Sequence, residues 1–283
     1  MDLLRSLEAC KLIVFDLDGT LYEETHHFDY YAEQIAARLP EAARNDFWRD
    51  YRDALDGRHT LRIGRAYDAA HDLILAHRRG RVTDAWHWDG APLSATEVEQ
   101  RYPEPLTFDR KELLNVGDQW WLPASVAVHY GIAEKALGEA FLATRDFMQS
   151  EAFHMRPIPG LFEWIDAFRV HGGKTALMTN SPEPDSRTIL KKLGLDQAFD
   201  ALIFWAEKPL KTEAHLRALL ERFQVAPTDA ASVGDNWQND IAPARRLGMK
   251  TVYIDAFGLA EGDDADWILP SLRTAFAAGE RRI

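Results

Sequence analysis

The most constraining feature of this chain is a short segment near its start, in which four apolar residues precede two aspartates and a glycine, at 12–19. Asp16 and Asp18 are two positions apart, and residues two apart in a β-strand point to the same side. Both carboxylates would therefore project together from the end of a buried strand, where they repel each other unless a cation or a proton intervenes. Open α/β sheets bind their ligands at that end of their strands, so the segment predicts a chemical site there.

Apolar runs and helical periodicities alternate over the two ends of the chain, which predicts an α/β fold. Besides the strand at 11–18, strands are expected at 174–179, 201–205, 230–234, 250–254 and 265–269. Helices are expected between them, at 161–171, 185–193, 212–223 and 239–247, with a last helix after Pro270. Strands that alternate with helices form a parallel sheet that is covered by helices on both faces.

The residues between about 22 and 155 interrupt this alternation. Helices are expected there at 28–39, 41–55, 61–77 and 132–149, whereas the stretch 80–119 lacks a clear period and is rich in proline and aromatic residues. Disordered segments are poor in aromatics, so we expect this stretch to be packed within the insertion. The predicted domains are a core at 1–21 and 156–283 and a mainly helical cap at 22–155, which leaves the core beside the two aspartates and is placed to act as a lid.

The composition narrows the classes of protein that remain. The chain has 283 residues, 46% of them hydrophobic, and a net charge of −12, which fits a soluble globular protein and argues against nucleic acid as a partner. No apolar run approaches the roughly 20 residues of a membrane span, so we expect no membrane association. The N-terminus lacks the apolar core of a signal peptide, and Cys10 is the single cysteine, so we expect a cytoplasmic protein. The oligomeric state stays open.

The two aspartates fit the roles of a nucleophile and a proton carrier. Asp16 is the candidate nucleophile, because carboxylates attack phosphoryl groups and form aspartyl-phosphate intermediates. The alternative is that it belongs to a turn, since Asp-Gly pairs favour turns. Asp18 is the candidate general acid and base, which would protonate the leaving oxygen and then activate water. Gly19 lets the chain approach a phosphate closely, and Thr20 beside it is a candidate substrate-binding residue.

Two later segments carry candidate phosphate-binding groups. Thr179 and Asn180 stand at the end of an apolar strand, where a hydroxyl and backbone N–H groups could hold phosphate oxygens or could form an ordinary turn. Lys208 precedes a proline, and a lysine ammonium suits a phosphate and a negatively charged transition state. Lys211 competes for this role, and either lysine could instead lie on the solvated surface.

The segment 232–240 supplies two more carboxylates. Asp235 is expected at the end of a strand and Asp240 near the start of the next helix, where an acidic residue could also serve only the helix dipole. If Asp16, Asp18, Asp235 and Asp240 converge on one crevice, their charges require a cation. A hard divalent ion with oxygen ligands and room for water is Mg²⁺, so we predict a magnesium site on these four residues.

Together these segments resemble the four motifs of phosphatases of the haloacid dehalogenase-like (HAD) superfamily. The resemblance covers residues 11–20 and about 157–270 and joins Asp16-x-Asp18-Gly19-Thr20 (motif I), Thr179 (motif II), Lys208 with its following proline (motif III), and Gly234-Asp235 with Asp240 (motif IV). It implies a Rossmann-like core, Mg²⁺ held by Asp16, Asp235 and the backbone carbonyl of Asp18, and a phosphorylated Asp16. An insertion directly after motif I is similar to the helical C1 cap. Superfamily members that cleave carbon–halogen bonds lack the second aspartate, so Asp18 favours phosphoryl transfer.

The sequence therefore predicts a Mg²⁺-dependent phosphatase that hydrolyses a phosphomonoester of a small metabolite through an intermediate on Asp16. Three alternatives stay open: a phosphomutase, a 5′-nucleotidase-like specificity, and a non-catalytic binding module on the same fold. The second is suggested because Asp56-Gly57-x-x-Thr60-Leu61-x-x-Gly64 is similar to a cap segment of pyrimidine 5′-nucleotidase-like members, whose motif I is also followed by Leu-Tyr, here Leu21-Tyr22. Aromatic residues of the insertion could stack on a base or a sugar, but packing in the core is the favoured interpretation because aromatics usually supply burial. These residues are Trp86, Trp88, Trp120 and Trp121.

Overall fold

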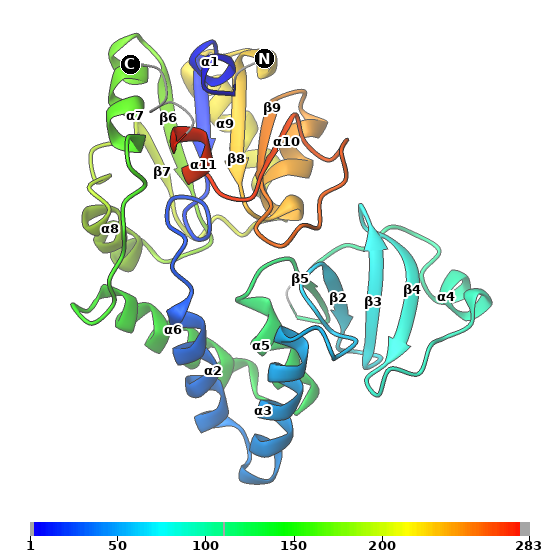
Figure 1. Ribbon diagram of the computed structural model, residues 1–283. Coiled ribbons are helices and arrows are strands. Elements are labelled where there is room, and N and C mark those ends of the chain that lie inside the picture. The colour runs from blue at the N-terminus through cyan, green and yellow to red at the C-terminus, as the bar shows by residue number, and fades with distance from the viewer. Residues whose placement is uncertain (1–2, 110, 278–283) are drawn as a thin grey trace. The chain divides into compact units, whose positions relative to one another are not determined.

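The computed structural model describes residues 3–109 and 111–277, and the chain divides into two compact units (Figure 1). The first, which we call the core unit, consists of Met1–Glu24 and Met148–Ile283, and the second, the insert unit, of Thr25–Phe147. The chain leaves the core unit soon after Asp16 and Asp18 and returns to it more than a hundred residues later. In the part of the chain that is described, no helix combines the length and the apolar character needed to cross a membrane.

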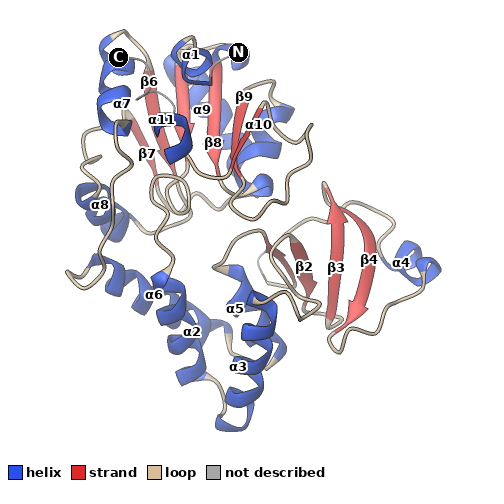
Figure 2. Ribbon diagram, viewed as in Figure 1, coloured by secondary structure: helices blue, strands red, loops and turns tan. Residues whose placement is uncertain are grey.

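The core unit is built on a six-stranded sheet in which every neighbouring pair is parallel (Figure 2). Its order is β10-β9-β8-β1-β6-β7, and the strands are β1 (Leu12–Phe15), β6 (Lys174–Met178), β7 (Ala201–Ile203), β8 (Ala230–Gly234), β9 (Lys250–Ile254) and β10 (Trp267–Leu269). All four residues of β1 are buried, as expected for a strand that is covered on both faces. The predicted parallel α/β fold is confirmed, and β1, the strand that leads to Asp16, lies inside the sheet between β8 and β6.

Helices follow or precede these strands along the chain. They are α1 (Leu3–Glu8), α7 (Leu161–Val170), α8 (Glu183–Lys192), α9 (Thr212–Phe223), α10 (Ala242–Arg246) and α11 (Arg273–Ala277), with a 3₁₀ turn at Pro227–Asp229. Leu216 and Leu219 of α9 share a hydrophobic cluster with Leu12 and Val14 of β1, because their helical spacing turns one face of α9 toward the sheet. This packing fixes β1 from one side.

The helix expected at 239–247 begins differently from the prediction. A π-helical turn covers Trp237–Ile241, and the α-helix α10 starts only at Ala242. The side chain of Asn236 accepts a hydrogen bond from the backbone N–H of Asn239, at 3.2 Å, and so caps the π-turn. Single π-turns of this kind are common at functional sites, and this one carries Asp240.

The insert unit combines helices with a sheet that the sequence did not indicate. Its helices are α2 (His26–Arg38), α3 (Glu41–Leu55), α4 (Ala95–Arg101), α5 (Trp121–His129) and α6 (Glu134–Gln149). The C-terminal end of α6 already belongs to the second segment of the core unit, which begins at Met148. Its strands form an antiparallel sheet in the order β4-β3-β2-β5 and are β2 (Arg65–Asp68), β3 (Leu73–Arg78), β4 (Arg81–His87) and β5 (Leu113–Val116).

The prediction of a helix at 61–77 is wrong, because this stretch contains β2, a turn and most of β3. The chain reverses after β3 at Arg79 and Gly80, which both have positive φ, at 51° and 85°. A two-residue turn with two such residues matches the twist of an antiparallel hairpin and commits the flanking residues to strands. The stretch 80–119, in which the sequence showed no clear period, holds β4, α4 and β5.

The four tryptophans that the sequence analysis considered for stacking pack against the hydrophobic core of the insert unit, as favoured from the sequence; they are Trp86, Trp88, Trp120 and Trp121. The buried carboxylate of Asp50 on α3 accepts hydrogen bonds from Trp88 Nε1, just after β4, at 2.9 Å and from Tyr130 Oη, just after α5, at 2.5 Å. It also accepts one from Arg49 Nε, its neighbour on α3, at 2.9 Å. Burial alone would raise the pKa of Asp50, but these donors outweigh it and hold that pKa below its usual range. The carboxylate of Asp50 therefore stays charged and links α3 to Trp88 and Tyr130.

Candidate active site

The carboxyl end of β1 leads directly into the first two candidate residues. The backbone N–H of Asp16 continues the pairing with β8 by donating to the carbonyl of Val233 at 2.9 Å. The chain then turns, with Leu21 N–H donating to the carbonyl of Leu17 at 2.9 Å and Gly19 at a φ of 79°. A Cβ at Gly19 would lie 2.2 Å from Asp235 Oδ2, so only a glycine allows the turn to approach Asp235 this closely.

A buried lysine bridges two of the predicted carboxylates. Lys208 Nζ lies 2.6 Å from Asp16 Oδ1 and 2.6 Å from Asp240 Oδ1. All three side chains are almost inaccessible to solvent, at 3% for Lys208, 8% for Asp16 and 3% for Asp240. A charged group in such a place requires a partner of opposite charge, and the ammonium supplies it to both carboxylates.

Burial and charge act against each other on these groups. Burial raises the pKa of Asp16 to about 7, with Lys208 opposing the rise and the nearby carboxylates of Asp240 and Asp18 adding to it. Burial also raises the pKa of Asp240, again against Lys208. For Lys208, burial alone would lower the pKa, but the two carboxylates outweigh it and raise that pKa above its usual range. The ammonium of Lys208 therefore stays charged, whereas burial disfavours the charged forms of the two carboxyl groups beside it.

The backbone of Lys208 is held in place by Asn180. The Asn180 side chain accepts a hydrogen bond from Lys208 N–H at 2.7 Å and donates Nδ2 to the Lys208 carbonyl at 3.1 Å. Asn180 follows Thr179 at the end of β6, so this reciprocal pair ties the loop after β7 to the end of β6. Lys211, the competing lysine, is half exposed and pairs with Glu207, whereas Lys208 reaches the carboxylates.

Asp18 is surrounded by hydroxyl groups from two segments. Tyr22 Oη donates to Oδ1 of Asp18, Ser181 Oγ donates to Oδ2 at 2.9 Å, and Thr179 Oγ1 lies 3.5 Å from Oδ2. Thr179 was predicted from the sequence, whereas Tyr22 and Ser181 were not. Ser181 could have been proposed from the sequence, because its hydroxyl group stands only two positions after that of Thr179.

The carboxylates of Asp16, Asp235 and Asp240 form one acidic group. Within residues 3–109 and 111–277, one ligand oxygen from each of the three lies within 4.8 Å of the other two. Asp240 is oriented by the backbone N–H of Asn236, which donates to its Oδ2 at 3.3 Å, while Thr20 Oγ1 lies 3.5 Å from Asp16 Oδ2. This donor set of carboxylate oxygens suits a hard cation. The side-chain oxygens of Asp18 are not part of the group.

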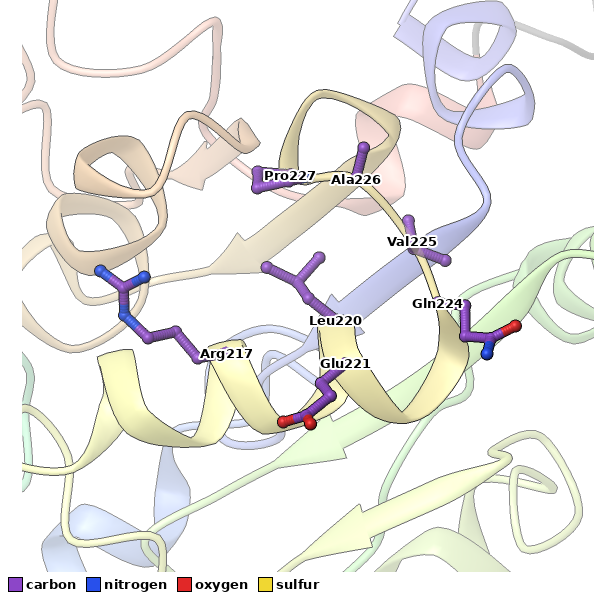
Figure 3. A pocket seen from close by; sticks show the side chains of 7 residues that line it. All are labelled: Arg217, Leu220, Glu221, Gln224, Val225, Ala226 and Pro227. Carbon is purple, nitrogen blue, oxygen red and sulfur yellow. The ribbon is translucent and has the colours of Figure 1, made fainter.

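A separate hollow of about 470 Å³ lies at the end of α9 (Figure 3). It is lined by side chains from α9 and from the segment that leads to β8, and none of the candidate residues above belongs to it; the lining residues are Arg217, Leu220, Glu221, Gln224, Val225, Ala226 and Pro227. The carboxylate site therefore does not coincide with this hollow.

Known proteins are similar to this chain in both sequence and fold. Residues 10–248 match the family model for haloacid dehalogenase-like hydrolases. A phosphoglycolate phosphatase from Nitrosospira multiformis is 31% identical over 141 residues, which are 47% of this chain and 61% of that protein. A phosphoserine phosphatase from Thermus thermophilus is 32% identical over 154 residues, which are 52% of this chain and 59% of that protein.

The chain thus spans less than two thirds of the length of these two relatives. Among solved structures, a predicted phosphoglycolate phosphatase from Haemophilus somnus 129pt superposes with a TM-score of 0.51 at 18% identity, over 96% of this chain and 98% of that one. At this identity the superposition shows a shared fold.

Proposed function

Since this chain belongs to the haloacid dehalogenase-like hydrolase family, we propose that it is a Mg²⁺-dependent phosphatase that hydrolyses phosphomonoesters of small metabolites. The observation that carries the proposal is the contact of Lys208 Nζ with Asp16 beside the acidic group of Asp16, Asp235 and Asp240. A carboxylate next to a fixed ammonium and a cation site can attack an anionic phosphoryl group, which repels an unassisted carboxylate. The relatives named as phosphatases support the same reaction class.

In the proposed reaction, a carboxylate oxygen of Asp16 attacks phosphorus while the bond from phosphorus to the leaving oxygen breaks. Asp18 donates its proton to that leaving oxygen, so the alcohol departs neutral. In the second step Asp18 takes a proton from water as the water oxygen bonds to phosphorus. The bond between Asp16 and phosphorus then breaks and releases inorganic phosphate, with both carboxyl groups returned to their first state.

Lys208 and Thr179 have places that suit the binding of the phosphoryl group. Lys208 Nζ contacts the attacking carboxylate, so its positive charge lies beside the place where the anionic phosphoryl group must approach Asp16. Thr179 stands at the end of β6 with its hydroxyl 3.5 Å from Asp18 Oδ2, on the side where a leaving oxygen must meet the acid. We assign Asn180 the support of Lys208, on the basis of its two hydrogen bonds to the Lys208 backbone.

The acidic group fits a magnesium ion by its chemistry. Asp16, Asp235 and Asp240 offer carboxylate oxygens within 4.8 Å of one another, and carboxylate oxygens are ligands that suit a hard divalent cation. We propose that Asp16 and Asp235 hold the ion, that the backbone carbonyl of Asp18 faces it, and that Asp240 supports the site. When bound, Mg²⁺ supplies positive charge that allows an anionic nucleophile to approach a phosphate dianion.

The test is phosphate release from a panel of phosphomonoesters, with Mg²⁺ or with EDTA. The panel contains para-nitrophenyl phosphate, phosphoglycolate, phosphoserine, β-glycerol phosphate and a nucleoside monophosphate. We expect metal-dependent release that Asp16→Asn abolishes. Asp229→Asn is the matched control, because Asp229 pairs with Lys11 at the opposite, amino end of β1 and should leave the rate unchanged. Full activity in EDTA would refute the metal requirement, and activity that survives Asp16→Asn would refute the nucleophile.

A further inference from the structure

The two carboxylate oxygens of Asp18 face different parts of the core unit. Oδ1 accepts the hydroxyl of Tyr22, which comes from the turn that follows β1. Oδ2 accepts Ser181 Oγ at 2.9 Å and lies 3.5 Å from Thr179 Oγ1, and both hydroxyls come from the end of β6. Oδ2 is therefore the oxygen on the side of the proposed phosphoryl site.

Packing and the backbone hold the hydroxyl group of Tyr22 at Oδ1 of Asp18. The side chain of Tyr22 is 1% exposed, so the ring is fixed by packing, and its backbone forms an isolated bridge with that of Asp18. Leu21, the preceding residue, is fully buried and closes the same turn through its N–H on Leu17. The phenol hydroxyl cannot turn away from Asp18 without unpacking this turn.

A hydroxyl donor at one oxygen decides where a carboxyl group carries its proton. A phenol O–H is a stronger donor than an alcohol O–H, and an oxygen that accepts such a bond takes the carbonyl role in the neutral acid. The proton of Asp18 is then favoured on Oδ2, next to Thr179 and Ser181. Both serine and threonine hydroxyls can also accept a hydrogen bond, so they are compatible with a proton there.

We propose that Tyr22 is a positioning residue that holds Oδ1 of Asp18, so that Oδ2 delivers the proton to the leaving oxygen and later takes one from water. The inference rests on the proposed phosphatase function. In the first step the proton leaves Oδ2 as the bond between the leaving oxygen and phosphorus breaks. In the second it returns to Oδ2 from the water whose oxygen bonds to phosphorus.

Leaving-group dependence separates this role from a merely structural one. An alkoxide needs a proton when it leaves, whereas para-nitrophenolate leaves without one, so loss of acid positioning should slow only the alkyl ester. Tyr22→Phe keeps the ring and removes the hydroxyl. For the alkyl phosphomonoester that the wild-type protein hydrolyses fastest in the panel, we expect kcat/KM to fall by roughly 10- to 100-fold, the range for a hydrogen bond to a charged group. For para-nitrophenyl phosphate we expect a fall of less than about threefold.

Thr175→Val is the matched control, since it also removes a buried hydroxyl from the core unit. Thr175 lies near the amino end of β6 and donates to the carbonyl of Ala198 at 2.6 Å. Both kcat/KM values should stay near those of the wild type, and thermal melting should show that all variants are folded.

The outcomes distinguish this inference from the function on which it rests. If the wild-type protein hydrolyses both esters and Asp16→Asn hydrolyses neither, the proposed function stands. An equal loss on both esters in Tyr22→Phe, or no loss on either, then overturns the role of Tyr22 alone. If Asp16→Asn keeps its activity, the proposed function fails and the inference about Tyr22 fails with it.

Discussion

Gly19 offers the sharpest test of how closely the turn after β1 must approach the acidic group. An added Cβ would lie 2.2 Å from Asp235 Oδ2 and 2.8 Å from its Cγ. Carbon–oxygen contacts in proteins are about 3.3 Å or longer, so Gly19→Ala requires Asp235 or the turn to shift by about 1 Å. A misplacement of about 1 Å near reacting groups can cost roughly 100-fold in rate, and we expect a loss of this size in kcat/KM.

The same substitution also strains the backbone, because Gly19 has a φ of 79°. An alanine in the left-handed region costs about 1–2 kcal/mol in folding free energy, which by itself should not affect the chemistry. Gly194→Ala separates the two effects, since Gly194 has a φ of 70° and nothing lies within 4 Å of the position of its Cβ. Both variants should lose a similar amount of stability, but only Gly19→Ala should lose activity.

The assay is steady-state phosphate release at saturating Mg²⁺, together with chemical denaturation of both variants. A calorimetric titration with Mg²⁺ should show weaker binding to Gly19→Ala than to Gly194→Ala, because Asp235 is a proposed ligand. If the kcat/KM values of the two variants agree within about threefold, a displacement of roughly 1 Å at Asp235 has no effect and the proposed site is wrong.

Three further predictions concern other charged groups. Lys208→Met should lower kcat/KM by roughly 100- to 1000-fold, as measured by phosphate release, because it removes the ammonium beside the nucleophile, whereas Lys211→Met should leave kcat/KM unchanged. Mg²⁺ alone should raise the melting temperature of the wild-type protein but not that of Asp235→Asn, since an ion that binds only the folded state stabilises it. Asp50→Asn should destabilise the protein by about 2 kcal/mol at neutral pH, as measured by denaturant unfolding, since it removes a buried charge-assisted acceptor. The pKa of Asp50 is lowered in the folded state, so its contribution is complete above the ordinary aspartate pKa of about 4 and is lost as the pH falls further; the effect of Asp50→Asn should shrink in the same range.

The strands and helices of the core unit were predicted well because the pattern that indicates each of them lies within one short segment of the sequence. The four residues of β1 form an apolar run, and parallel strands that are buried on both faces read as such runs. The helix α9 was predicted at its observed bounds, since its leucines recur at helical spacing and face the sheet. The residues that end these strands are therefore found from the sequence alone, because a polar residue after an apolar run marks the edge of the sheet.

The insert unit was predicted less well because its strands are short and depend on pairing. Residues 65–68 and 73–78 form strands through the neighbouring strands of their sheet, and their apolar residues also fit a helical spacing. The turn at Arg79 and Gly80, where the hairpin reverses, was the local sign of strands. A period read within one segment does not show which distant segment pairs with it.

The same limit applies to the supporting residues of the site. Ser181 reaches Asp18 only after β1 and β6 pair in the register that places Phe15 beside Leu177, whereas Tyr22 reaches Asp18 within the turn that follows β1. Substrate binding by Asn180 stays a prediction, and the hydrogen bonds of its side chain to the backbone of Lys208 could not be read from the sequence. Roles of this kind depend on contacts between segments far apart in the sequence.

The measurement that tests the central claim most directly is the capture of a phosphorylated aspartate. Wild-type protein would be mixed with para-nitrophenyl phosphate and Mg²⁺, quenched in acid within one turnover, and reduced with borohydride, which marks an acyl phosphate at its carbon. Mass spectrometry of the digested protein should then place the reduced residue at Asp16 and find none in Asp16→Asn. A mark on a different residue, or turnover without any marked aspartate, would contradict nucleophilic attack by Asp16.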